Sequence, residues 1–440
     1  MNHGLPPGPT FALASRLNYV RNPYELFAEC RRKYGDPFTV TTSMKTVITG
    51  DPAAVKQIFT APTEHFKALQ SEAQRRVIGD SFTSMSGPPH RAQREIVTPG
   101  LRADGLRSLA PMMVDAVVAQ MESWHPGRTL DMVEEGVTIA LEIIVRTIFS
   151  VEDPAAIAER RTAIRDFGDR LSNKTFLILS VLGFLNESLP PNARFRAAQM
   201  RLRQLLHETI DQIRAAPEQR RGLLSRIVGT RTPDGAPAMA DSVIVDNMVT
   251  MLIAGHETSA MSIGWAMFWA HSNPEIYRKL MEELADVDVE GDPNATQTLP
   301  YLNAFVREMM RFFPPVPDII RVIGETPLEV KGYRLTENTQ VAACVFLTHF
   351  DPDIYPEPDV FRPERHLERR YSAFEYYPFG GGERICVGNT FAPMEIKIAL
   401  AVLLKRGRFT LLNTKRPHVA RTRFLMGPKE PIMCRYEGPL

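Results

Sequence analysis

The ten residues from Phe379 to Gly388 read Phe-Gly-Gly-Gly-Glu-Arg-Ile-Cys-Val-Gly and lead into an apolar run that begins at Phe391. Glycines in such a loop allow the backbone to adopt positive φ and to approach a flat ligand closely. The start of the helix expected after the loop offers unpaired N–H groups and positive potential. Both features stabilise an anionic sulfur, so the pattern predicts that Cys386 is held as a thiolate.

A thiolate in such a loop suits haem iron, because it pushes electron density onto bound oxygen. Three other interpretations of an isolated cysteine compete with this one. A buried structural cysteine is the usual case, and we expect it for Cys30, Cys344 and Cys434. A phosphate-binding loop would need a Lys-Ser/Thr pair after the glycines, and a zinc site would need further ligands nearby. The sequence around Cys386 contains neither, so the haem ligand is favoured.

The loop resembles the haem-binding signature of the cytochrome P450 family, Phe-x-x-Gly-x-Arg-x-Cys-x-Gly, at every fixed position. The Ala and Glu that follow in the family fall on Ala392 and Glu395. The resemblance implies heme b (iron protoporphyrin IX) with Cys386 as the iron ligand. It further implies that three loop residues contact the cofactor: Phe379, Arg384 and Gly388. Pro393 departs from the pattern, and we expect it to kink or tighten the first turns of the following helix.

A second feature is the apolar, proline-free run from Ser242 to Ser272. It predicts one helix of about 30 residues, roughly 45 Å long, which is far above the average helix length. Its centre, Ala254-Gly255-His256-Glu257-Thr258-Ser259, resembles the family's oxygen-binding motif. A small pair followed by an acid and an alcohol can open a helix locally, make room for dioxygen and relay protons. The resemblance implies that Glu257 and Thr258 are catalytic and that Ala254 contacts the haem.

Two other interpretations apply to this motif. The acid and the alcohol can simply be polar positions on a buried helix. His256-Glu257 also begins the zinc-protease pattern His-Glu-x-x-His, but the fifth position is Ala260, which excludes that site.

Charged residues elsewhere fit the same family. Glu308 and Arg311 lie three residues apart on a predicted helix, Leu302–Phe313, where they can pair. Together with Arg365 they resemble the family's Glu-x-x-Arg network, which supports the haem pocket and is not catalytic. Haem carries two propionates that need cationic partners when they are buried. The resemblance implies four such partners: His90, Arg94, Arg321 and Arg384.

The predicted architecture is mainly α with a minor β portion, in a single haem domain over residues 1–440. The resemblance implies the cytochrome P450 fold, with the long central helix over the haem. A further helix is expected at about Asn389–Lys405. Short β-type runs occur at Phe38–Ile48, Leu328–Arg334 and Gln340–Leu347.

Composition excludes several classes of protein. Hydrophobic residues make up 44% of the 440 residues and charged residues 23%, which is typical of a globular protein. The net charge of +1 gives no reason to expect a nucleic-acid partner. Met1–Phe11 has no signal pattern and no run of about 18 apolar residues occurs, so no membrane span is expected. Leu5–Pro9 resembles the hinge that follows the anchor in membrane-bound members, without the anchor. The scattered cysteines indicate a reducing compartment, and we expect a cytoplasmic monomer.

The resemblance implies a monooxygenase that inserts one atom of dioxygen into a C–H or C=C bond. A lipophilic substrate, such as a fatty acid, terpenoid or polyketide, is expected because the segments at family-typical pocket positions are apolar. These segments are Phe82–Met85, Phe176–Leu185, Met248–Leu252, Val316–Ile320 and Phe424–Met426. The alternatives are a peroxide-driven hydroxylase or isomerase on the same fold, and a non-enzymatic haem sensor or carrier.

An external electron donor is expected, namely a ferredoxin or flavodoxin with its NAD(P)H reductase. The sequence contains no flavin or iron–sulfur motif, and its four cysteines cannot ligate a cluster while Cys386 holds haem. The donor is predicted to dock through four cations near the haem loop: Arg91, Lys397, Lys405 and Arg406.

Overall fold

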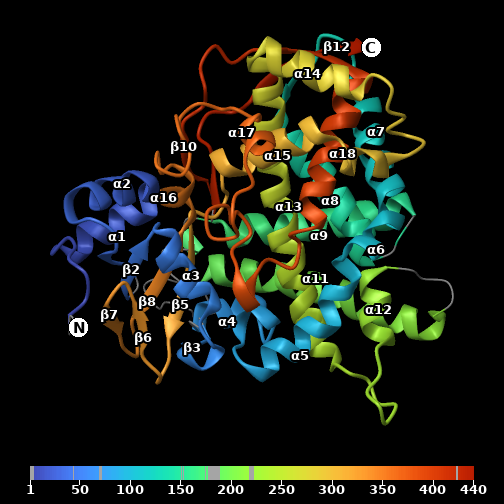
Figure 1. Cartoon of the computed structure of the whole chain (residues 1–440). Helices are drawn as coiled ribbons and strands as arrows, with labels where there is room; N and C mark the ends of the chain where they lie inside the picture. Colours follow the sequence, from blue (N-terminus) through green and yellow to red (C-terminus); the bar gives the residue numbers. More distant parts are fainter. Residues whose placement is uncertain are drawn as a thin grey trace.

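The structure is a computed structural model that describes residues 4–42, 44–68, 72–149, 151, 153–173, 175–176, 189–217, 222–422 and 425–440. It is mainly helical with a minor β portion, which confirms the predicted fold class. The largest sheet and the first two helices lie at one side of the molecule, and the longer helices fill the rest (Figure 1).

Several helices begin with a proline in the first turn and an acidic or amide side chain just before it. Asp51 accepts a hydrogen bond from the Ala54 N–H, and Asp153 accepts one from the Ala156 N–H, so each caps its helix. The α-helices of the described residues are α1 (Ala12–Arg21), α2 (Pro23–Tyr34), α3 (Pro52–Thr60), α4 (Glu72–Ile78), α5 (Pro88–Val97), α6 (Ala103–Leu106), α7 (Ala110–Glu122), α8 (Met132–Phe149), α9 (Pro154–Leu171), α11 (Pro190–Ala215), α12 (Leu223–Gly229), α13 (Asp241–Ser272), α14 (Pro274–Leu284), α15 (Pro300–Phe312), α16 (Val345–His349), α17 (Arg365–Glu368) and α18 (Phe391–Arg406).

The strands form one larger mixed sheet and smaller antiparallel ones. The five-stranded sheet has the order β1-β2-β8-β5-β3, with β2 and β8 parallel. Three strands pair in the order β4-β12-β9, and β6-β7 and β10-β11 are two-stranded. The bounds are β1 (Phe38–Thr41), β2 (Lys45–Thr49), β3 (Phe66–Lys67), β4 (Thr129–Asp131), β5 (Asp318–Ile323), β6 (Leu328–Val330), β7 (Tyr333–Leu335), β8 (Gln340–Cys344), β9 (Gly407–Leu411), β10 (Val419–Thr422), β11 (Leu425–Pro428) and β12 (Met433–Pro439).

Each β-type run predicted from the sequence contains β structure, but none is one uninterrupted strand. The run Phe38–Ile48 is the hairpin β1–β2, and Leu328–Arg334 belongs to the hairpin β6–β7. Gln340–Leu347 is strand β8 followed directly by helix α16. The predicted runs were therefore correct in type and too long as single strands.

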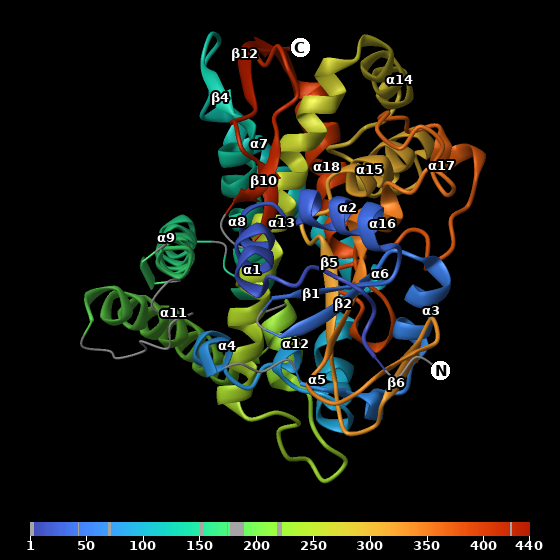
Figure 2. The ribbon, with the colours of Figure 1, turned by 90° about the vertical axis from the view of Figure 1, so that its left-hand side faces the viewer.

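Helix α13 runs through the middle of the helical part in both views (Figures 1 and 2). Its bounds, Asp241–Ser272, confirm the long helix predicted at Ser242–Ser272. It packs closely on α8, where a Cβ added at Gly136 would lie 2.7 Å from the Ala260 carbonyl oxygen. Apolar residues all around a helix indicate burial on every side, and α13 is accordingly the central element of the fold.

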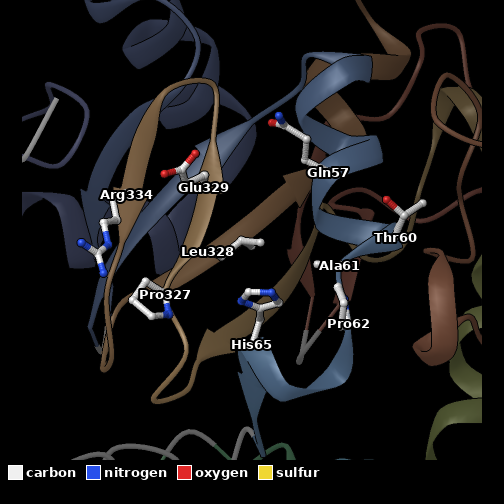
Figure 3. A pocket seen from close by; sticks show the side chains of 9 residues that line it. All are labelled: Gln57, Thr60, Ala61, Pro62, His65, Pro327, Leu328, Glu329 and Arg334. Atoms are coloured by element: carbon white, nitrogen blue, oxygen red, sulfur yellow. The ribbon is translucent and has the colours of Figure 1, made fainter. Parts of the chain in front are cut away.

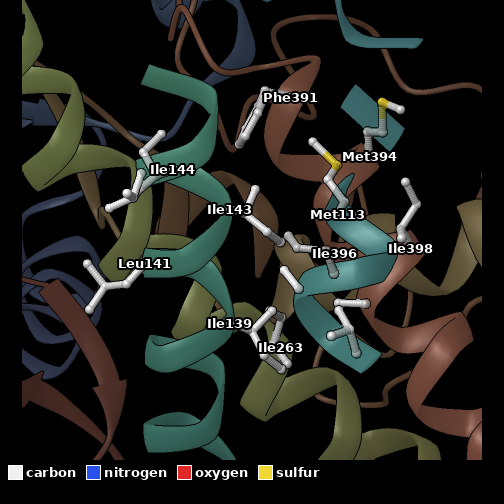
Figure 4. Close-up of a cluster of buried hydrophobic side chains, with 14 of the residues drawn as sticks. Met113, Ile139, Leu141, Ile143, Ile144, Ile263, Phe391, Met394, Ile396 and Ile398 are labelled. Atoms are coloured by element: carbon white, nitrogen blue, oxygen red, sulfur yellow. The ribbon is translucent and has the colours of Figure 1, made fainter. Parts of the chain in front are cut away.

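The core between α7, α8, α13 and α18 consists of interlocking aliphatic and sulfur-containing side chains (Figure 4). Met113 of α7, Ile139 and Ile143 of α8, Ile263 of α13 and Ile396 of α18 are all buried. Together they pack α18, the helix that follows the glycine-rich loop, against α7, α8 and α13. Within the described residues, none of the helices is both long and apolar enough to cross a membrane.

Helix α18 carries the proline that departs from the family pattern. It begins at Phe391, so Pro393 lies in its first turn, where the backbone N–H has no partner within the helix anyway. The proline therefore does not interrupt the hydrogen bonds of the helix. Whether Pro393 kinks or tightens the first turns stays a prediction.

Candidate active site

The glycine-rich loop lies against the end of helix α3. Gly382 has φ of +67°, and a Cβ there would lie 2.2 Å from the Phe59 carbonyl oxygen, so only glycine fits. The loop is closed by the Cys386 N–H, which donates to the Phe379 carbonyl at 2.9 Å. This places the Cys386 side chain at the end of a tight turn.

The Cys386 sulfur is accessible, whereas the other three cysteines are buried and free. Burial among surrounding protein atoms raises the pKa of the Cys386 thiol, and the Gly388 backbone N–H and the Arg94 charge only partly offset it. Four residues lie between Cys386 and the first residue of α18, so the helix start contributes less than the sequence suggested. A metal cation bound at the sulfur would favour the thiolate over the thiol.

The central motif of α13 has an unusual exposure pattern. Ala254 is exposed although it lies in the middle of this otherwise buried helix, and Thr258, one turn later, is half-buried. The Thr258 hydroxyl donates to the Ala254 carbonyl at 2.9 Å. Glu257, between them, is buried. The helix remains α-helical here, so the predicted local opening is not observed.

His90 and three arginines, Arg94, Arg321 and Arg384, gather beside the loop. Burial lowers the pKa of His90 to about 4, helped by the nearby charges of Arg384, Arg94 and Arg321. Burial also lowers the pKa of each arginine, and for Arg321 the neighbouring Arg384 adds to the effect. Arg384 donates to the Ser86 hydroxyl at 2.6 Å and to the Met85 carbonyl. None of the four forms an ion pair with a described carboxylate, so the cluster is suited to an added anion.

The Glu308 network is assembled as predicted and includes one more member. Arg311 donates twice to Glu308, at 2.8 and 2.9 Å, and Arg365 donates at 3.0 Å. His366 lies 3.1 Å from Glu308 through Nε2, and the sequence gave no sign of this contact. Burial raises the pKa of Glu308, but hydrogen bonds from His366 and Arg311 outweigh it and lower the value to about 2.

The predicted docking cations differ in their surroundings. Lys397 is buried, with 6% of its surface exposed, and donates to the Asn303 side-chain oxygen at 2.7 Å. Lys405 donates to three backbone carbonyls after α14, and Arg406 pairs with Glu290 at 3.5 Å. Arg91 on α5 is exposed. The assignment of Lys397 to a docking surface was wrong.

Most of the predicted pocket segments are buried. Phe82, Met426 and all of Met248–Leu252 are buried, whereas Val316 is exposed. Within Val316–Ile320, the Asp318 carboxylate accepts hydrogen bonds from the Tyr19 hydroxyl, which ties this segment to α1. Residues 177–185 of the segment Phe176–Leu185, and Phe424, lie outside the described residues.

An open surface pocket of about 590 Å³ lies elsewhere, between α3 and the β6–β7 hairpin (Figure 3). Two of its polar side chains already contact neighbouring backbone groups. Gln57 accepts a hydrogen bond from the Lys331 N–H, and the His65 ring contacts the Thr326 carbonyl. The pocket contains none of the predicted site residues.

Comparison with known proteins identifies the family. Residues 3–435 match the family model described as Cytochrome P450. The chain belongs to the cytochrome P450 family. Cytochrome P450 135B1 of Mycobacterium tuberculosis is 30% identical over 421 residues, which cover 93% of this chain and 87% of that protein. Cyclooctat-9-en-7-ol 5-monooxygenase of Streptomyces melanosporofaciens is 27% identical over 413 residues, 92% of this chain and 89% of the relative. The retinoic acid-bound cyanobacterial CYP120A1 shares the fold, with a TM-score of 0.84 at 20% identity over 100% of both chains.

Membership makes this P450 an oxygen-using monooxygenase that binds haem and receives electrons from a redox partner. Its residues fit a haem on independent physical grounds. An exposed cysteine could hold the iron, an exposed Ala254 on the central helix could face the porphyrin, and three arginines that form no ion pair with a described carboxylate could hold the propionates.

Ser259 and Glu395 of this P450, to which the sequence gave no role, are in contact. The Ser259 hydroxyl donates to the Glu395 carboxyl at 2.5 Å, and both side chains are buried. Burial raises the pKa of Glu395 to about 8. Both residues lay within the recognised motifs, but a contact between α13 and α18 cannot be read from motif spacing.

Proposed function

We propose that this P450 uses heme b held by the Cys386 thiolate to insert one oxygen atom into a lipophilic organic substrate. When bound, the haem supplies the activation of dioxygen and the oxidation itself. The observation that carries the assignment is the exposed Cys386 beside three arginines that form no ion pair with a described carboxylate. Arg94, Arg321, Arg384 and His90 are the proposed propionate ligands, and Phe379, Gly388 and Ala254 the proposed contacts of the porphyrin.

Glu257 and Thr258 are proposed to deliver protons to the oxygen-binding position. The Thr258 hydroxyl donates a hydrogen bond to the Ala254 carbonyl, which fixes it one turn from the exposed Ala254 on α13. A hydroxyl fixed in this way can order a proton donor at a defined place. Glu257 is buried next to it in sequence, where its carboxyl can exchange a proton with a neighbouring group.

A lipophilic substrate is proposed because the segments expected at the pocket, including one on α13 itself, are mainly apolar. Met248–Leu252 is buried, and Phe82 and Met426 are buried apolar residues of the other segments. Ligand pockets lined by such residues favour apolar ligands. The name of the Streptomyces relative describes an alcohol with one double bond, and this supports the same class for the present chain.

The electron donor is proposed to be a ferredoxin or flavodoxin reduced by its NAD(P)H reductase. Arg91 is exposed on α5, one residue from His90, and provides a cationic contact near the haem loop. We further propose that the protein is a cytoplasmic monomer, which fits the four free cysteines.

The experiment that tests this function starts from the purified haem-loaded protein. A lipophilic library is screened for the spectral shift that occurs when substrate displaces water from the iron. Compounds that bind are then incubated with ferredoxin, reductase and NADPH under ¹⁸O₂. Incorporation of one ¹⁸O atom into a product supports the monooxygenase. Product formed with peroxide but never with the electron donor, or isomerisation without ¹⁸O, would instead assign the alternatives.

A further inference from the structure

The segment Asp80–Ser86 connects three parts of the molecule. It runs from the end of α4 to the start of α5 and contains one short 3-10 turn, Phe82–Ser84. Near its start it contacts Asn247 of α13, and at its end the Ser86 hydroxyl accepts a hydrogen bond from Arg384 of the glycine-rich loop. Helices α4 and α5 lie near the same end of α13 in both views (Figures 1 and 2). The segment therefore bridges the helix that carries Ala254 and a residue proposed to bind a propionate.

Two buried amide side chains hold this segment, and we call Gln93 and Asn247 the amide clamp. Asn247 Oδ1 accepts a hydrogen bond from the Phe82 N–H at 2.8 Å. Asn247 Nδ2 donates to Gln93 Oε1 at 3.0 Å, and Gln93 Nε2 donates to the Asp80 carbonyl at 3.2 Å. The chain of hydrogen bonds thus starts at Phe82 and returns to the same segment at Asp80. One amide from α13 and one from α5 together close a single bend of the backbone.

The backbone groups at the two ends fix the direction of these hydrogen bonds. A backbone N–H only donates and a carbonyl only accepts. The Asn247 oxygen must therefore face Phe82, which directs its NH2 group to Gln93, and the Gln93 NH2 group must face Asp80. Buried backbone groups that lose their partners cost free energy, so the bend depends on both amides.

Gln93 lies on the helix that carries two of the proposed propionate ligands. It follows His90 by one turn of α5 and is adjacent to Arg94. Its Nε2 also lies 3.1 Å from the Met85 sulfur, and the Met85 carbonyl accepts a hydrogen bond from Arg384. The position of the segment is therefore fixed relative to residues that are proposed to hold the haem.

The amide clamp also lies close to the exposed stretch of α13. Asn247 precedes the exposed Ala254 by two helical turns, about 10 Å along the axis. Met85 is half-buried, so part of its side chain is available to a ligand. The flexible thioether of methionine packs readily against apolar groups. A shift of the bend would move this side chain relative to Ala254.

We propose that Gln93 and Asn247 are positioning residues, which hold Phe82–Met85 as one wall of the substrate site at a fixed place beside the haem. The inference rests on the proposed binding of a lipophilic substrate and adds the residues that determine its fit. A wall held in one position needs no ordering when an apolar ligand binds, which increases affinity. A ligand too small to reach the wall does not gain from it.

The test compares imidazole with 4-phenylimidazole on the haem-loaded protein. Both bind haem iron through nitrogen, and only 4-phenylimidazole carries an apolar ring that extends away from the iron. Gln93→Met and Asn247→Leu remove the two amides at nearly constant volume. We expect both variants to bind imidazole as before and to bind 4-phenylimidazole about fivefold more weakly, which corresponds to the loss of one neutral hydrogen bond. The affinities are measured from the spectral shift on nitrogen ligation.

Gln340→Met is the matched control, because Gln340 is also a buried amide and accepts a hydrogen bond from the Thr46 hydroxyl at 2.8 Å in the five-stranded sheet. It should lower the free energy of unfolding without changing the ratio of the two affinities. Amide hydrogen exchange in Asp80–Ser86 should become faster in the two clamp variants and remain unchanged in the control. Reduced carbon monoxide spectra show that each variant retains its haem site.

An unchanged ratio of the two affinities in the clamp variants would overturn the proposal. An equal loss of both azoles would also overturn it, because the haem site itself would then be altered. Unchanged hydrogen exchange would show that the amides do not hold the segment. Should Asn247→Leu fail to retain haem, Gln93→Met decides by the same comparison.

The proposed function fails separately from the amide clamp, because the azole test requires neither a substrate nor an electron donor. If no compound of the lipophilic library gains an ¹⁸O atom while the ratio still falls in the clamp variants, the clamp stands and the proposed oxidation is wrong. If a product forms and the ratio is unchanged, the function stands and the clamp is wrong.

Discussion

At the level of single residues, the Cys386 thiol depends on what is bound to it. Burial raises its pKa, the Gly388 N–H and the Arg94 charge lower it, and a cation bound at the sulfur would favour the thiolate. We therefore expect Cys386→Ser to lose the strongly red-shifted band of the reduced carbon monoxide complex. Cys344→Ser, at a buried free cysteine, is the control and should keep the band. The opposite result for the two variants would show that the ligand is elsewhere.

The proposed role of Thr258 in proton delivery can be tested separately from the binding of haem and substrate. Its hydroxyl donates to the Ala254 carbonyl and is not needed to hold the helix, which remains α-helical on both sides. Thr258→Ala should leave haem and substrate binding intact but divert reduced oxygen to peroxide, because an ordered hydroxyl is lost. The measurement is product formed per NADPH consumed, with peroxide determined in parallel. Ser262→Ala, which removes the same i to i−4 hydrogen bond one turn later, should leave this ratio unchanged.

The sequence predicted which residues belong to the site where a motif fixes their positions. It did not predict whether a side chain on a helix is buried or exposed. His90 and the three arginines beside the loop were found because they match a pattern, and the structure brings them together. Lys397 lies on the helix that was predicted to follow the loop, yet its side chain is buried. Nearly every side of α18 is buried, so its sequence contains no polar stripe that would mark an outer face.

At the level of elements, the long helix α13 was predictable because it contains no proline and is bounded by turn residues. The hairpins were harder to predict from the sequence. Lys331-Gly332 separates β6 from β7 with φ of +51° and +79°, the geometry of a tight hairpin turn, and the glycine was a usable signal. Between β1 and β2 the chain reverses without Gly, Pro or Asn, so the run read as one strand.

The Glu308 network joins α15 to α17 and should be the acid-sensitive part of the fold. The folded pKa of about 2 lies below the ordinary 4.5, so the stabilisation is present above pH 4.5 and is lost as the pH falls toward 2. Glu308→Gln leaves two buried arginines without a counter-charge and should destabilise the protein by about 3–5 kcal/mol at pH 7. Urea unfolding from pH 3 to 7 measures both effects. Glu364→Gln, at a partly exposed ion pair, should lose less than about 1 kcal/mol.

Helix α18 contains a buried cation that we expect to oppose folding. Burial lowers the pKa of Lys397 to about 8 from 10.5, and Asn303 supplies one acceptor and no charge. The folded state favours the neutral amine, so this cost is full below pH 8 and disappears as the pH rises toward 10.5. Lys397→Met should raise the melting temperature at pH 7, and the gain should shrink by pH 9.5.

Lys405→Met on the same helix is the comparison for that prediction. The Lys405 ammonium binds three carbonyls at the end of α14, so its loss should lower the melting temperature. If Lys397→Met lowers the melting temperature at pH 7 as Lys405→Met does, the contact with Asn303 outweighs the burial of the charge.

For the whole molecule, the burial of Lys397 reduces the number of predicted cations that an electron donor could contact. Lys405 and Arg406 are engaged with α14 carbonyls and with Glu290, so reversing them changes local structure as well as surface charge. Arg91 is exposed on α5 and close enough to His90 to contribute to lowering the pKa of that residue. It is therefore the predicted cation whose charge is both available to a partner and near the proposed haem.

First-electron transfer from an acidic ferredoxin should thus depend on Arg91 and on salt. Complementary charges mainly accelerate encounter, and raising the ionic strength from about 0.01 M to about 0.5 M shortens the Debye length several-fold. Stopped-flow reduction under carbon monoxide should slow over this range and should slow further in Arg91→Glu. Lys33→Glu on α2, which lies away from α5 in both views (Figures 1 and 2), makes the same charge change and should have little effect. Equal slowing in both variants would mean that only net charge matters, and a rate indifferent to salt would exclude electrostatic docking on this face.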